Sequence, residues 1–225
     1  MGSHQLRFRG GMVPLWLFLC PFIRCKTSVA QVLDQSYDPT GHITVSDGFG
    51  GFNSNQEYAQ TFRAGLSGTV TRVDVFVKRV TGTAGSMILE VRAGLDNGFP
   101  DGAISPEGVL GTATLPSTSV PTTSGFVSFV LNNPAPVTLG DLFAIDLHVS
   151  SSAGTFSWFG SQNDPYPAGN EYEREVGNHG WFDIGTAVQG DLGFRTFVNV
   201  PEAGCFGVLT LVAATLLSRH RARQF

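Results

Sequence analysis

Short runs of alternating apolar and polar residues constrain this fold more than any other feature of the sequence. The valines of residues 71–78 stand at every second position, and so do the apolar residues of 86–92 and 142–149. Successive side chains of a β-strand point to opposite faces, so each run predicts a strand with one face in a core. The opposite faces carry residues expected to point outward, among them Glu90, Arg92, Asp146 and His148.

This alternation and the turn residues between the runs predict nine strands. They are expected at residues 58–63, 71–78, 86–92, 109–115, 126–131, 142–149, 155–160, 171–176 and 192–198. Turn formers such as Asn132-Asn133-Pro134 separate them, and residues 31–51 are expected to be a linker in which 48–52 form a loop or an edge strand. No helical pattern interrupts the series. The prediction is an all-β, antiparallel β-sandwich, with jelly-roll topology favoured by analogy.

Composition excludes several classes of protein. Only 14% of the residues are charged, while the chain holds 28 glycines and 18 phenylalanines. Disordered chains are poor in aromatic residues and rich in charge. Residues 32–199 hold seven basic and seventeen acidic side chains, a formal charge of −10, against −4 for the whole chain. Such an acidic body disfavours nucleic acid as a partner.

The N-terminus carries the pattern of a secretory signal peptide. Arg7 and Arg9 precede an apolar run at 12–23, and the small residues Ser28-Val29-Ala30 follow. A basic start, an apolar stretch and small residues before a cut are typical of such signals. The prediction is therefore a signal peptide over 1–30, cut after Ala30, rather than a buried helix.

The C-terminus carries a motif, an apolar segment and a basic end. Pro201-Glu202-Ala203 is followed by the apolar segment 204–217, and then by Arg219, Arg221 and Arg223. A helix over that segment is expected to cross a membrane with the arginines in the cytoplasm. These residues resemble the tripartite PEP-CTERM sorting signal of Gram-negative bacteria, with Ala203 where the motif has its second proline. The predicted order is a signal peptide (1–30), a β-sandwich (31–199) and a sorting signal (200–225).

The resemblance implies export and recognition by an exosortase-type sorting enzyme. It also implies location in the cell envelope or outside the cell, in association with exopolysaccharide. The body, through residues 60–68 and 191–197, resembles uncharacterised envelope β-sandwich domains that precede such anchors. That second resemblance implies a fold and a surface location but no activity.

Catalytic and zinc motifs are not found in the body. All three cysteines, Cys20, Cys25 and Cys205, lie in the terminal segments, which leaves the body without a disulfide or a thiol nucleophile. No serine stands in a nucleophile elbow, and no histidine or cysteine pair has the sequence spacing of a zinc site. A non-catalytic protein without a cofactor is expected, apart from a structural calcium ion.

The calcium candidates are Asp164, Glu171 and Glu173, because carboxylate oxygens suit a hard cation. In a strand, Glu171, Glu173 and Glu175 share one face, and the ordinary interpretation of such a row is a solvated surface. An alternative is a glycan-active hydrolase that uses carboxylates between Asp164 and Asp191, which requires two carboxyl groups across a cleft.

Aromatic and amide residues gather in the same region and indicate a carbohydrate site. The candidate ligand-binding residues are Trp181, Tyr166, Tyr172, Asn178 and Asp183. Ligand sites combine an apolar lining with a few placed polar groups. Trp158 is expected in the core and Trp181 as an exposed sugar platform. A third interpretation, a passive matrix protein without a specific ligand, predicts that both tryptophans are buried.

Overall fold

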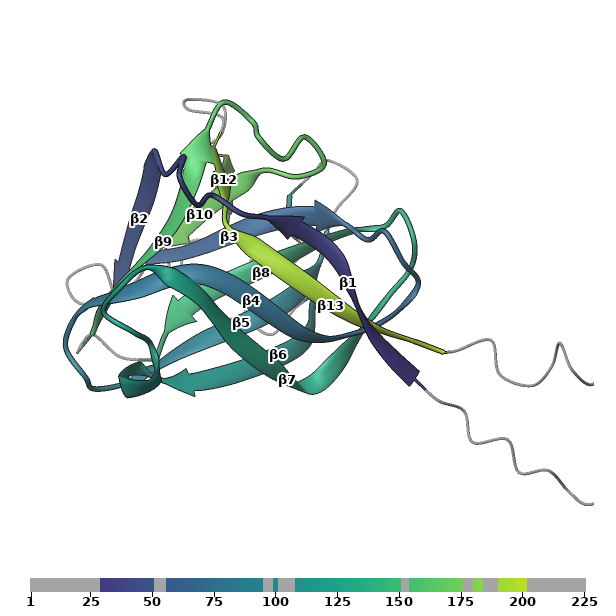
Figure 1. Cartoon of the computed structure of the whole chain (residues 1–225), viewed down its shortest axis with the longest axis horizontal. Coiled ribbons are helices and arrows are strands. Elements are labelled where there is room, and N and C mark those ends of the chain that lie inside the picture. The colour runs from purple at the N-terminus through teal and green to yellow at the C-terminus, as the bar shows by residue number, and fades with distance from the viewer. Residues whose placement is uncertain are drawn as a thin grey trace, which may run out of the picture. The chain divides into compact units, whose positions relative to one another are not determined.

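The structure, a computed structural model, describes residues 29–50, 56–94, 99–100, 108–150, 154–175, 180–183 and 190–201. They form two antiparallel β-sheets, which Figure 1 shows as two layers. The seven-stranded sheet consists of β1 (Val29–Tyr37), β2 (Val45–Gly50), β4 (Gly68–Thr81), β7 (Gly125–Val137), β9 (Thr155–Gln162), β12 (Gly190–Leu192) and β13 (Phe194–Pro201). The six-stranded sheet consists of β3 (Gln56–Arg63), β5 (Ser86–Ala93), β6 (Val109–Pro116), β8 (Leu142–Val149), β10 (Glu171–Glu175) and β11 (Phe182–Asp183). The all-β prediction is confirmed, and the helical content of the described residues is the single turn η1 (Ser117–Ser119).

The core lies between the sheets and consists of the side chains predicted to face inward. Val73, Val75 and Val77 of β4 are fully buried, as are the inward residues Met87, Leu89 and Val91 of β5. Aromatic rings join the two layers, since Phe62 of β3 lies 5.8 Å from Phe143 and 5.9 Å from Phe194 between ring centroids. Trp158 is also fully buried, and its indole N–H donates to the Gly193 carbonyl at 2.9 Å. The prediction of Trp158 as a core residue is confirmed.

Eight of the nine predicted strands are present, the ninth (192–198) is divided at Gly193 between β12 and β13, and the expected linker at 31–51 is wrong. β1 pairs with β13 from Val29–Pro201 to Tyr37–Phe194, and β2 pairs with β9 at the edge of the sheet. β1 escaped prediction because most of its side chains are exposed or half-buried, which leaves little alternation. β2 agrees with the edge-strand alternative for the glycines near residue 48. β1 begins before the predicted cleavage site at Ala30, and β13 ends at Pro201 of the sorting motif.

The predicted turn at Asn132-Asn133-Pro134 lies inside β7 rather than between strands. β7 nevertheless departs from regular pairing there. Val70 of β4 faces Ala135 of β7, whereas Arg72 faces Val130, so four residues of β7 lie opposite one of β4. The turn signal marks this irregularity, since proline cannot donate a ladder hydrogen bond.

Among the described residues, no helix has the length and apolar character needed to span a bilayer. Residues 1–28 of the predicted signal peptide, the segment 204–217, and Glu202, Arg219, Arg221 and Arg223 all lie outside the described residues.

Candidate functional site

The outer face of the six-stranded sheet carries a cluster of charged side chains on β3, β5, β8 and β10. This back-face cluster consists of Glu57, Glu90, Arg92, Asp146, His148 and Arg174. Strand register brings its members together, because Glu57 faces Arg174 and Glu90 faces Asp146 across neighbouring strands. Side chains directly opposite each other in antiparallel strands lie close enough to pair.

The ion pairs of the back-face cluster converge on Asp146. Its Oδ2 accepts a hydrogen bond from Arg92 Nε at 2.7 Å and lies 3.5 Å from a terminal nitrogen of Arg174. Arg92 also pairs with Glu90, and Arg174 with Glu57. Asp146 and Arg92 are fully buried although both lie on the outward face. Burial alone would raise the pKa of Asp146, but His148 and the two arginines hold it below its usual value.

Trp181 covers part of the back-face cluster, and the prediction that it is exposed is wrong. Only 8% of its surface is accessible, and the guanidinium of Arg174 lies 4.3 Å from the centre of its ring. It packs in a small apolar group with Ala59, Ala144 and Tyr172. The ring of Phe99 lies 4.9 Å from that of Tyr172. Glycine flanks Trp181 in the sequence, but nothing local reveals that a charged sheet face lies beneath it.

The remaining candidate ligand residues do not form a platform with Trp181. Tyr172 is 2% exposed on the outer face, whereas Tyr166 belongs to the core between the sheets and donates its hydroxyl hydrogen to Gln35 at 2.9 Å. Asn178 lies outside the described residues. Asp183 is described only through its backbone, which pairs with Tyr172 in β10.

A second group of carboxyl side chains lies between the sheets. Glu171 of β10 is 2% exposed, and its carboxyl group lies beside that of Asp47 on β2. Burial, together with the nearby Asp47, Asp191 and Glu173, raises the pKa of Glu171 to about 10. The fully buried Asp191 accepts from Gln60 Nε2 at 2.9 Å and from the Tyr166 backbone N–H at 2.9 Å. Burial raises its pKa to about 6.

The prediction that Glu171, Glu173 and Glu175 form a solvated row is therefore wrong for Glu171. Glu171 faces inward beside Gln60, and Glu173 is half-buried and accepts a hydrogen bond from Gln56 at 2.7 Å. Glu171 is buried in its neutral, protonated form rather than exposed as a solvated carboxylate.

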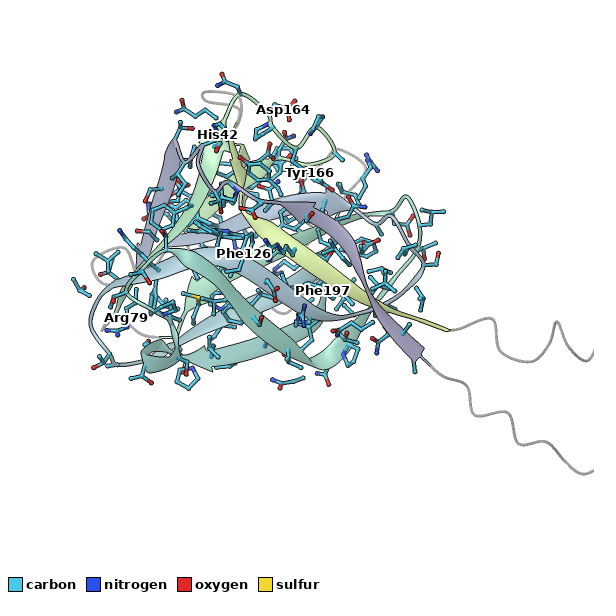
Figure 2. The ribbon with its side chains drawn as sticks, in the orientation of Figure 1. His42, Arg79, Phe126, Asp164, Tyr166 and Phe197 are labelled. Atoms are coloured by element: carbon cyan, nitrogen blue, oxygen red, sulfur yellow. The ribbon has the colours of Figure 1, made fainter. Side chains whose placement is uncertain are left out.

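The expected calcium ligands do not come together in the structure. Asp164 is exposed, in a turn where its φ is 48°, and Figure 2 labels it there. Within the described part of the chain, one set of three potential ligand residues has its donor atoms within 4.8 Å of one another, and that set is Glu57, Asp146 and His148.

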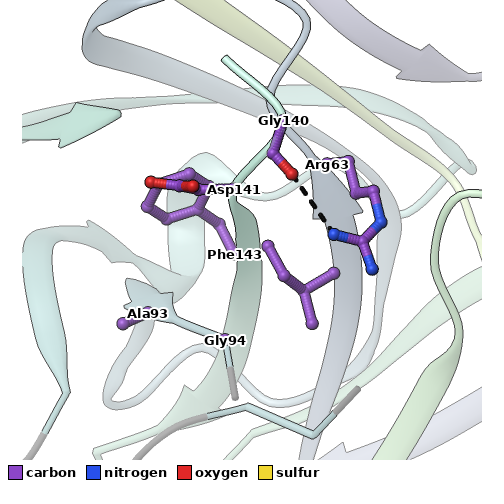
Figure 3. Close-up of a pocket in the computed structure, with 7 residues that line it drawn as sticks. Arg63, Ala93, Gly94, Gly140, Asp141 and Phe143 are labelled. Atoms are coloured by element: carbon purple, nitrogen blue, oxygen red, sulfur yellow. Dashed lines mark hydrogen bonds between the residues drawn. The ribbon is translucent and has the colours of Figure 1, made fainter. Parts of the chain in front are cut away.

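A small pocket of about 300 Å³ lies at one end of the central strands β3, β5 and β8 of the six-stranded sheet (Figure 3). Arg63 lines it and donates to the Gly140 carbonyl at 3.2 Å. Asp141 is its one acidic lining residue, so it does not provide the facing carboxyl pair that glycoside hydrolysis requires.

The outer face of the seven-stranded sheet carries cations stacked on phenylalanine rings. The Arg72 guanidinium lies 3.5 Å from the centre of the Phe197 ring, and that of Arg195 lies 3.7 Å from the centre of Phe126. The Lys78 ammonium lies 5.2 Å from the ring centre of Phe159. We call these six residues the cation–phenylalanine face; Figure 2 labels Phe126 and Phe197 on it.

Exposed apolar side chains border this face, with Val130 69% and Leu33 49% exposed. Each arginine also meets an aspartate, since Arg72 Nε lies 3.2 Å from Asp74 and Arg195 lies 2.9 Å from Asp38. Sequence analysis missed this face. The available signal was Phe76, an aromatic residue on the outward face of a strand that also carries Arg72 and Lys78.

No protein-family model matches the chain, and no curated protein sequence matches it.

Proposed function

We propose that this protein is an exported, non-catalytic β-sandwich that is held at the cell envelope and binds acidic polysaccharide through the cation–phenylalanine face. The observation that carries the proposal is the stacking of three cations on three phenylalanine rings across the outer face of one sheet. A guanidinium has five N–H donors, so the stacked Arg72 and Arg195 can bind a sugar carboxylate with donors that Asp74 and Asp38 do not occupy. The apolar border suits the C–H faces of sugar rings.

Local charge supports an acidic rather than a neutral polysaccharide. Three of the seven basic residues of the body, Arg72, Lys78 and Arg195, lie on this one face. The body as a whole is acidic, but at physiological ionic strength charges more than about 8 Å apart are largely screened. With Asp74 and Asp38 counted against Arg72, Arg195 and Lys78, the face keeps a net charge of +1, which favours a bound uronic acid.

The proposal also includes export of the protein and its retention at the cell envelope. Residues 1–30 would direct export, and 200–225 would form a sorting signal with a membrane helix, cut by an exosortase-type enzyme. Jelly-roll connectivity of the sandwich belongs to the same proposal. The export and sorting elements are supported by the sequence patterns of the two ends, and the jelly-roll connectivity by analogy alone.

Co-sedimentation with a polyuronate such as alginate tests the binding face. The double variant Arg72→Gln/Arg195→Gln should lose at least about tenfold in affinity, since it removes two charge-assisted contacts. Arg63→Gln removes the same kind of charge from the six-stranded sheet and should bind as the parent protein does. Equal binding by the double variant and the parent would refute the assignment of the face.

A passive matrix component without a specific ligand is the second candidate. Burial of both tryptophans favours it, since Trp158 is 0% and Trp181 is 8% exposed. Failure of the parent protein to sediment with either acidic or neutral polysaccharide would select this candidate.

A further inference from the structure

Three side chains of the back-face cluster have donor atoms gathered around one point. β3 and β8 are neighbours in the six-stranded sheet, which places Glu57 beside β8 on the face that carries Asp146 and His148. Asp146 and His148 are two residues apart in one strand and so point the same way. One ligand atom from each of the three lies within 4.8 Å of the others.

Two of these donor atoms are unused. Asp146 is fully buried, and its Oδ1 has no hydrogen-bond partner among the described residues, because both arginines approach Oδ2. Within the same described part of the chain, His148 Nδ1 also has no hydrogen-bond partner. The two atoms lie 3.9 Å apart, which is too long for a hydrogen bond. A polar atom buried without a partner is costly and calls for an explanation.

Charge gives the same indication. The cluster holds three carboxylates, Glu57, Glu90 and Asp146, against two arginines, so one further positive charge, from a bound cation or from protonated His148, would balance it. A cation placed between Asp146 Oδ1 and His148 Nδ1 supplies that charge and satisfies both unused atoms. In a tetrahedral site with zinc–ligand bonds of about 2 Å, two ligand atoms lie about 3.3 Å apart, so the gap of 3.9 Å would have to close by about half an ångström when zinc binds.

We propose that Glu57, Asp146 and His148 form a zinc site on the outer face of the six-stranded sheet. Imidazole and carboxylate together suit zinc, whereas calcium and magnesium prefer oxygen donors alone. The His148 side chain is 16% exposed, which gives an entry path and a side on which a water completes the four ligands. Arg92 and Arg174, bound to the other carboxylate oxygens, orient the ligands as outer-shell partners do.

The sequence contains no zinc-binding motif, because the ligands of this site do not follow such a spacing. Its ligands are a histidine and an aspartate two residues apart in a strand, joined by a glutamate 89 positions earlier in the chain. The site is independent of the proposed polysaccharide face, which lies on the other sheet.

Calorimetric titration of tag-free, chelator-treated full chain with zinc chloride tests the proposal. We expect one zinc ion per chain and a rise in melting temperature that EDTA reverses, because a ligand that binds only the folded state stabilises it. His148→Ala should weaken binding at least about 10–100-fold, the loss typical of even an outer-shell change. His42→Ala removes an exposed histidine from another part of the chain and should bind as the parent does.

Cobalt titration supplies a readout that does not depend on stability. Tetrahedral coordination should give an intense visible absorption band in the parent and in His42→Ala but not in His148→Ala. The proposal is overturned if the parent takes up no zinc, or if His148→Ala binds zinc as the parent does. Absence of zinc uptake would mean that a proton on His148 supplies the missing charge.

Discussion

Truncating Trp181 to alanine separates a packing role from a binding role. Trp181 is 8% exposed, so the substitution removes a buried indole, and such changes cost about 3–5 kcal/mol. We expect the lower end, about 3 kcal/mol, because Trp181 packs in a small group outside the main core, where neighbouring side chains can move into the space. Trp158→Ala should lie at the upper end, since that side chain is fully buried between the sheets.

Urea unfolding followed by circular dichroism measures both free energies. At about 2–4 °C per kcal/mol for a domain of this size, Trp181→Ala should lower the melting temperature by roughly 6–12 °C. Phe182→Ala is the matched control, because this neighbouring aromatic is 59% exposed and its loss should cost no more than about 0.5 kcal/mol. If Trp181→Ala kept full stability and instead abolished polysaccharide binding, the packing argument would be refuted.

Three further predictions concern charge and delivery. The folded-state pKa values of Glu171 and Asp191 are raised above their unfolded values, so the folded state binds more protons and stability should fall as pH rises from 5 to 8. In melting curves measured from pH 5 to 8, Glu171→Gln should lose less stability than the parent protein. An equal loss in both proteins would contradict the raised pKa of Glu171. Arg92→Leu leaves buried carboxylates unpaired and should lower the free energy of unfolding in urea by about 3–5 kcal/mol. Arg195→Leu breaks a half-exposed pair and should lower it by about 1 kcal/mol or less. Equal losses in the two variants would mean that burial does not strengthen the Arg92 pair. In a host without an exosortase, the full chain should fractionate with the inner membrane and a chain ending at Ala203 should be periplasmic, so a truncated chain that still pellets with membranes would exclude the tail as the anchor.

Strand faces were predictable from sequence because alternation is a local property. Val73, Val75 and Val77 face the core as predicted, and Glu90 and Asp146 point outward as predicted. Alternation assigns a side chain to a face but does not say what covers that face. Asp146 is therefore outward-facing and fully buried at once, beneath a cover that includes a tryptophan from another part of the chain.

The candidate sites depend on which residues face each other across strands that are distant in the sequence. Local sequence patterns do not carry that information. Glu57 meets Arg174 because β3 pairs with β10, and Asp47 meets Glu171 because β2 folds over the same sheet edge. The row at 171–175 was recognised as unusual, but its partner Asp47 lay in a segment expected to be a linker. The edge strand considered for 48–52 did not extend back to Asp47, so the partner of the buried glutamate was not found.

The pairing of β1 with β13 has a mechanical consequence for a protein held by its C-terminus. Val29 lies opposite Pro201, so the chain enters and leaves the sandwich at the same end (Figure 1). β13 is bonded along both sides, to β1 and to β4. A pull on the tail along the axis of β13 therefore loads two ladders in shear, so that many hydrogen bonds must break together. If the proposed tail anchors the protein, the sandwich would therefore resist such a pull without opening strand by strand.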